Sequence, residues 1–105
     1  MNIKLKQAQR VIELLNDGKT ETFTSHKFIG TYIKWYESEY LDLLVDEKNN
    51  PKNTEGIFTP VHRKIGQFLS NNQKKLCISY IRDIPDMNIH HLETPCAEWH
   101  FESSK

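Results

Sequence analysis

The spacing of apolar residues changes once along the chain, and this change constrains the fold more than any other feature. As far as Asn72, apolar residues recur at intervals of three and four, which is typical of amphipathic helices. From Leu76 onward they alternate with their neighbours, which is typical of strands that bury one face. A chain of 105 residues with this arrangement is expected to form a single α+β domain, 1–105.

Three helices are expected in the first part of the chain, covering residues 4–16, 24–45 and 59–72. Asp17-Gly18 ends the first, and a short extended segment with Phe23 in the core precedes the second. Thr59 is suited to cap the third helix, and Pro60 is suited to its first position. The polar residues 46–56 predict an exposed, flexible loop.

Two strands are expected after the helices, at 76–81 and 96–101. Residues 83–95 include two prolines and are expected to form a long hairpin loop between them. The predicted fold is therefore three helices followed by a two-stranded β-hairpin.

Charge is sorted into blocks along this chain, although the formal net charge is zero. Residues 35–47 contain five acidic residues and no Lys or Arg, and residues 83–104 repeat that composition. Residues 56–82 contain five Lys or Arg and no acid. Blocks of one sign create local fields that attract charged partners.

Three helices followed by a hairpin resemble a winged helix-turn-helix domain, and the third helix with the hairpin carries this resemblance. The resemblance implies that the third helix enters the major groove of double-stranded DNA. Its outward positions would contact bases and phosphates, and two lysines at its end would contact phosphates. The DNA-binding residues implied are His62, Arg63, Lys64, Gln67, Asn71, Lys74 and Lys75.

An alternative follows from the acidic hairpin, because carboxylates repel phosphate. The same fold would then bind a basic protein through its second helix and hairpin, as a small inhibitor or adaptor of the kind that mobile elements encode. The residues for this role are Glu37, Glu39, Asp42, Asp46, Asp83, Asp86 and Glu93. The aromatic residues of the second helix exceed what a small core covers, which favours a homodimer.

No catalytic motif is present, and an enzyme is not expected. His26 and His62 have no acid or nucleophile at a recognisable spacing. Cys77, Cys96 and His100 fall on one face of the predicted hairpin, near His90 and His91, and raise the question of a zinc site. Their spacing matches no familiar zinc pattern, so neither a metal nor another cofactor is expected.

Two cysteines are too few for a disulfide framework. The N-terminus lacks the apolar segment of a secretory signal, and no apolar run is long enough for a membrane span. These features predict a cytoplasmic protein with free thiols and no membrane partner.

Overall fold

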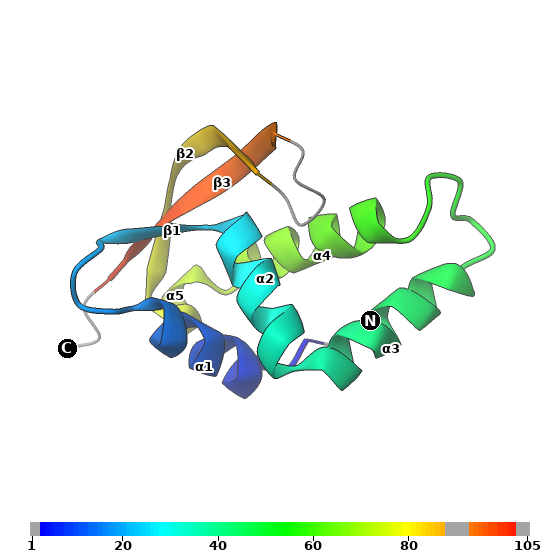
Figure 1. Cartoon of the computed structure of the whole chain (residues 1–105), viewed down its shortest axis with the longest axis horizontal. Coiled ribbons are helices and arrows are strands. Elements are labelled where there is room, and N and C mark those ends of the chain that lie inside the picture. Colours follow the sequence, from blue (N-terminus) through cyan, green and yellow to red (C-terminus); the bar gives the residue numbers. More distant parts are fainter. Residues whose placement is uncertain (1–2, 88–92, 103–105) are drawn as a thin grey trace.

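The structure, a computed structural model, describes residues 3–87 and 93–102, which form five helices and one three-stranded antiparallel sheet. The α+β class is as expected, but the sequence predicted only three helices and two strands, which is fewer than the described residues contain. No helix in the described residues is long and apolar enough to cross a membrane. The elements are α1 (Leu5–Leu15), β1 (Thr22–Thr24), α2 (Ser25–Trp35), α3 (Glu37–Lys48), α4 (Phe58–Asn71), α5 (Gln73–Leu76), β2 (Ile78–Met87) and β3 (Glu93–Phe101) (Figure 1).

The second helix expected from the sequence is two helices, α2 and α3. Tyr36 leaves helical geometry, with φ −131° and ψ 52°, and its N–H donates to the carbonyl of Tyr32 to close α2. Its own carbonyl accepts the first bond of α3, from Tyr40. The change of direction buries both Tyr32 and Tyr40, which are 0% and 5% exposed. Since apolar residues continue through the break, their spacing gives no sign of it.

The third predicted helix, α4, begins two residues earlier than expected, at Phe58 and not at Pro60. Ile57 occupies the cap position without a side-chain hydrogen bond, so the expected cap at Thr59 is wrong. Pro60 still lies in the first turn, where its missing N–H removes no helical bond. The short helix α5 follows and includes Leu76, which was expected to start a strand. Cys77 then adopts a left-handed conformation, with φ 55°, and turns the chain into β2.

The sheet has the order β1–β3–β2, so the strand nearest the C-terminus is central. Phe23 of β1 lies opposite Trp99 of β3, and its burial in the core is confirmed. The β2–β3 ladder continues outward as far as the pair Met87 and Glu93. The expected loop 83–95 is therefore mostly strand. Prolines 85 and 95 are paired opposite each other within this ladder and do not interrupt it.

The register of β2 and β3 shifts by one residue at Ile81. Tyr80 lies opposite Trp99, whereas Arg82 lies opposite Glu98, so Ile81 is an extra residue in a β-bulge. Before the bulge Tyr80 lines the space beside α4, and after it Asp83 does. The bulge therefore reverses the alternation that the sequence predicts for this strand.

Trp99 joins the sheet to the helices. Its side chain is 2% exposed, and its Nε1–H donates a 2.9 Å hydrogen bond to Oγ of Ser25, the first residue of α2. Tyr80 packs edge-on against it from β2, with ring centroids 5.7 Å apart. This packing fixes the hairpin beside α2 and α4, while α3 lies on the other side of α4 (Figure 1).

Candidate nucleic-acid interface

Helix α4 has one buried face and one polar face. Val61, Ile65 and Leu69 are each 0% exposed and pack into the core. On the other side Arg63 and Gln67, one turn apart, are exposed. The apolar spacing of residues 59–72 therefore predicted the inward face of this helix correctly.

The polar face of α4 borders a cleft of about 600 Å³. The hairpin forms the opposite wall, and the start of α2 closes one end. Residues of α4 in the lining are Thr59, His62, Arg63, Gly66, Gln67 and Ser70, and those of the hairpin are Tyr80, Asp83, Pro95, Cys96, Ala97 and Trp99.

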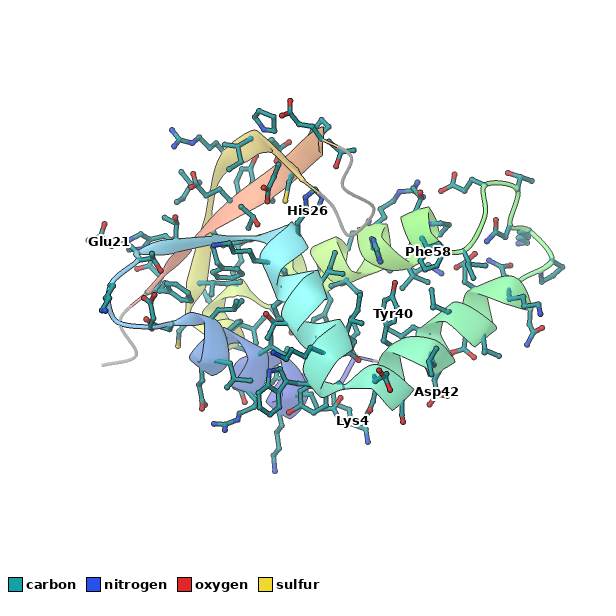
Figure 2. The ribbon with its side chains drawn as sticks, in the orientation of Figure 1. Lys4, Glu21, His26, Tyr40, Asp42 and Phe58 are labelled. Carbon is teal, nitrogen blue, oxygen red and sulfur yellow. The ribbon has the colours of Figure 1, made fainter. Side chains whose placement is uncertain are left out.

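Two of the residues implied for DNA binding are engaged in contacts within the domain. His62 Nε2 lies 2.7 Å from the hydroxyl of Tyr40, so that this side chain connects α4 to α3. Burial raises the pKa of Tyr40 to about 12, so the hydroxyl stays protonated at neutral pH. Figure 2 shows Tyr40 pointing from α3 toward α4, whereas Asp42 points away from it.

Lys64 is the second such residue, and it holds a buried carboxylate. Its Nζ lies 3.0 Å from Glu47 Oε1, and Glu47 is only 3% exposed. Asn50 and Asn53 donate to the other oxygen of the same carboxylate. The hydrogen bond from Lys64 is the main cause that lowers the pKa of Glu47, with Asn50 and Asn53 adding to it. We call Glu47, Asn50, Asn53 and Lys64 the α3–α4 cluster.

The other basic residues of the block 56–82 are all exposed, and two of them, Arg63 and Arg82, form ion pairs. Arg63 binds Glu55 at 2.5 Å in a pair whose side chains are 57% and 46% exposed. Arg82 binds Glu98 at 3.0 Å. Lys74 and Lys75 are exposed on α5, and Asn71 is exposed just before them. The basic block of residues 56–82 is thus largely neutralised by carboxylates from elsewhere in the chain.

The acidic residues of the alternative proposal do not form one surface. Those of α3 and those of the hairpin lie on opposite sides of α4 (Figure 1). Glu39 accepts a hydrogen bond from Gln7 of α1, and Asp83 accepts one from the hydroxyl of Tyr80. Asp86 lies beside His26. The exposed members are Glu37, Asp42 and Asp46 on α3, and Asp83 and Glu93 on the hairpin.

The zinc set considered from the sequence is not assembled. Ser79, not Cys77, lies opposite His100, and Cys96 lies opposite Ile84. The bulge and the left-handed turn at Cys77 break the symmetrical register that this set requires. His90 and His91 lie outside the described residues.

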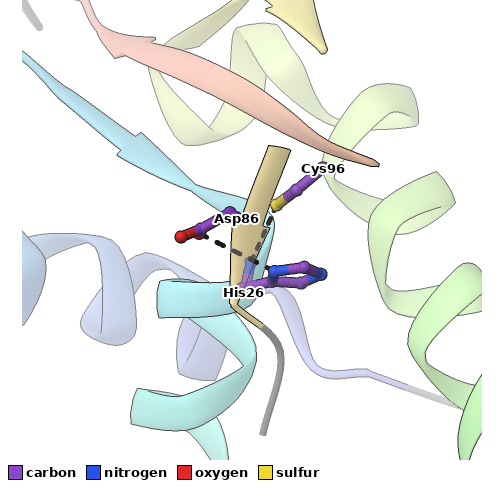
Figure 3. Close-up of side chains that lie close together, drawn as sticks. All are labelled: His26, Asp86 and Cys96. Atoms are coloured by element: carbon purple, nitrogen blue, oxygen red, sulfur yellow. Dashed lines mark hydrogen bonds and ion pairs between the residues drawn. The ribbon is translucent and has the colours of Figure 1, made fainter. Parts of the chain in front are cut away.

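A different group of ligand-type side chains is present, which we call the His26 cluster. It consists of His26 at the start of α2, Asp86 of β2 and Cys96 of β3 (Figure 3). No acid partner for His26 is recognisable in the sequence, because Asp86 is 60 positions away along the chain. Only the long ladder between β2 and β3 brings these side chains together.

Comparison with known proteins identifies no matching family model, no matching curated protein and no matching solved structure.

Proposed function

We propose that this chain is a DNA-binding protein of the winged-helix kind, with α4 as its recognition helix. The order of elements supports the proposal: a helix, a short strand, helices, and then a hairpin. The short strand β1 pairs with β3, so that the sheet backs the helices and the hairpin stands beside α4. The expected second helix is divided into α2 and α3, but α4 still lies beside the hairpin.

The observation that carries the proposal is the exposed face of α4, which contains hydrogen-bonding side chains and no carboxylate. Arg63 and Gln67 are suited to bidentate contacts with guanine and adenine edges. Lys74 and Lys75 extend this surface with two exposed charges for phosphate. His62 and Lys64 are left out of the proposed site because they hold α3 against α4.

The ion pair between Arg63 and Glu55 is compatible with DNA binding. Both side chains are about half exposed, and such pairs are worth about 0–1 kcal/mol. A bidentate contact discriminates against the wrong base by about 1–3 kcal/mol. Loss of the exposed pair with Glu55 is therefore a small cost beside the specificity that Arg63 would contribute.

The acidic hairpin limits the contact to the helix and its end. Asp83 lies in the cleft opposite Arg63, so phosphate is excluded from the hairpin side. With Lys74 and Lys75 as the proposed phosphate contacts, binding releases few counterions. We expect a plot of log Kd against the logarithm of the salt concentration to have a slope of only about 1.8.

Fluorescence anisotropy with a labelled pool of duplexes, measured over a salt series, tests the proposal. Arg63→Ala with Gln67→Ala should weaken binding at least about tenfold, and Lys74→Ala with Lys75→Ala should lower the salt slope by about 2. Arg10→Ala is the matched control, because Arg10 is an exposed arginine paired with Glu13 on α1. The proposal fails if duplexes do not bind, or if the control weakens binding equally.

A second candidate function, binding of a basic protein, is favoured by one observation on α3. Leu41 and Val45 are 54% and 52% exposed and lie one turn apart, with Asp42 and Asp46 next to them. An apolar pair beside two carboxylates suits a basic, amphipathic partner. Retention of one stoichiometric basic protein from a native lysate, lost on Leu41→Ser with Val45→Ser but kept by Arg63→Ala, would favour this candidate over DNA.

A further inference from the structure

Three side chains with different metal-ligand atoms meet where the hairpin approaches the start of α2. One ring nitrogen of His26, a carboxylate oxygen of Asp86 and Cys96 Sγ all lie within 4.8 Å of one another. His26 Nδ1 and Asp86 Oδ2 are 3.7 Å apart, which is too long for a hydrogen bond. Figure 3 shows the three side chains converging from α2, β2 and β3.

The two ring nitrogens of His26 differ in their contacts: Nε2 lies within hydrogen-bonding distance of a hydroxyl, whereas Nδ1 faces Asp86 without forming a hydrogen bond. Nε2 lies 3.3 Å from Oγ1 of Thr94, the residue opposite Asp86 in the ladder. Nδ1 is buried and has no hydrogen-bond partner among the described residues. A buried nitrogen of this kind calls for an explanation. A metal ion would supply one, since ligating histidines commonly fix their orientation through the other ring nitrogen.

Cys96 is placed to become a thiolate ligand. The thiol is 5% exposed. The backbone N–H of His26, in the first turn of α2, donates to Sγ at 3.3 Å. That N–H and the positive end of the helix favour a sulfur that carries negative charge. The environment therefore suits a sulfur ligand that is bound to a cation.

We propose that His26, Asp86 and Cys96 bind one divalent transition-metal ion, with Zn²⁺ as the best match. One imidazole nitrogen, one thiolate sulfur and one carboxylate oxygen are the three ligand types that Zn²⁺ takes in proteins. Zn–ligand bonds of about 2.0–2.3 Å in a tetrahedron place the ligand atoms about 3.3–3.6 Å apart. The spacing of 3.7 Å between His26 and Asp86 is already close to this value.

Binding breaks the S–H bond of Cys96, releases its proton to solvent and forms a bond from the sulfur electron pair to the metal. The fourth position remains for water, and His26 and Cys96 both line the cleft from which water would enter. The metal would also tie both strands of the hairpin to α2. Metal binding should therefore raise the melting temperature of the protein.

Titration of the reduced, chelator-treated full chain with Co²⁺, followed by competition with Zn²⁺, tests this site. We expect one equivalent of Co²⁺ to give a thiolate charge-transfer band and the strong visible bands of tetrahedral cobalt, all removed by Zn²⁺. Cys96→Ser should abolish the charge-transfer band, and Asp86→Asn should weaken affinity by more than tenfold. Thr94→Val should weaken it by about 10- to 100-fold through the orientation of His26.

Cys77→Ser is the matched control, because Cys77 is the other free cysteine and lies outside the cluster. Its spectrum should equal that of the unmodified protein. The proposal is overturned if the unmodified protein gives no tetrahedral spectrum, in which case His26 and Asp86 form a metal-free ion pair. It is also overturned if Cys77→Ser, and not Cys96→Ser, removes the band. Circular dichroism of each variant checks folding. If Cys96→Ser does not fold, the affinity of Asp86→Asn, which keeps the shape of Asp86, decides the question.

Discussion

The α3–α4 cluster and the His26 cluster are both partly buried polar groups, each with one buried residue, but they differ in how completely their atoms are bonded. In the first, the Glu47 carboxylate accepts bonds from Lys64, Asn50 and Asn53. In the second, His26 Nδ1 has no hydrogen-bond partner among the described residues and faces a carboxylate and a thiol. A satisfied network stabilises one structure, whereas an incomplete one leaves room for a ligand. We therefore assign the first cluster to folding and the second to binding.

Removal of the packing beneath the His26 cluster should give the largest effect. Trp99→Ala deletes a buried indole and its bond to Ser25, and we expect a loss of about 3–5 kcal/mol in the free energy of unfolding. Trp99→Phe keeps much of the volume and should lose distinctly less. Urea unfolding followed by circular dichroism measures both. Equal losses for the two variants would contradict the packing role given to Trp99.

Within the α3–α4 cluster, Lys64→Ala should leave the Glu47 carboxylate buried without its cation. We expect the melting temperature to fall by more than about 5 °C. Adding Glu47→Gln to this variant removes the unpaired charge and should restore part of the loss. A single variant as stable as the starting protein would show that this cluster does not stabilise the fold.

The same cluster predicts a pH dependence. The pKa of Glu47 lies below its usual value of 4.5, mainly because Lys64 donates to it. The lowered pKa gives a stabilisation that is complete well above pH 4.5 and is lost as the pH falls through the pKa of the folded state. Glu47→Gln should therefore flatten the acid limb of a plot of melting temperature against pH. It should not abolish that limb, since the pKa values of Asp17 and Glu102 are also lowered.

The smallest effect is expected one residue from Lys64, at Arg63. Its pair with Glu55 is exposed to solvent on both sides, so Arg63→Ala should change the free energy of unfolding by less than about 1 kcal/mol. Thermal unfolding of Arg63→Ala and Lys64→Ala in the same buffer compares the two positions directly. Similar losses of stability in the two variants would contradict the roles proposed here, in which Arg63 is available for binding and Lys64 stabilises the fold.

The sequence predicted secondary structure and burial correctly where these depend on a local pattern of residues. The spacing of apolar residues predicted α1, the inward face of α4 and the burial of Phe23. It predicted one helix where α2 and α3 form, because the apolar stripe continues across Tyr36 while only the backbone changes direction. Prolines 85 and 95 favour a loop in the sequence, although each lies opposite the other in the ladder.

The site was less accessible to sequence reasoning, because its contacts join residues far apart in the chain. Arg63, Gln67, Lys74 and Lys75 lie exposed as expected. The engagement of Lys64 by Glu47 depends on how α3 packs against α4. The His26 cluster depends on the length of the hairpin, which the sequence underestimated.

The bulge at Ile81 has a consequence for how such a chain changes over generations. In a strand without the bulge, Arg82 would share the face of Tyr80. The guanidinium of Arg82 would then face α4, in the place where the Asp83 carboxylate lies now. Loss of the codon for Ile81 would leave a regular ladder with Asp83 on the same side. If the strand lost its bulge but kept Ile81, Arg82 would instead lie at the cleft. One backbone irregularity thus sets the sign of the charge that the hairpin presents to α4, without a change in composition.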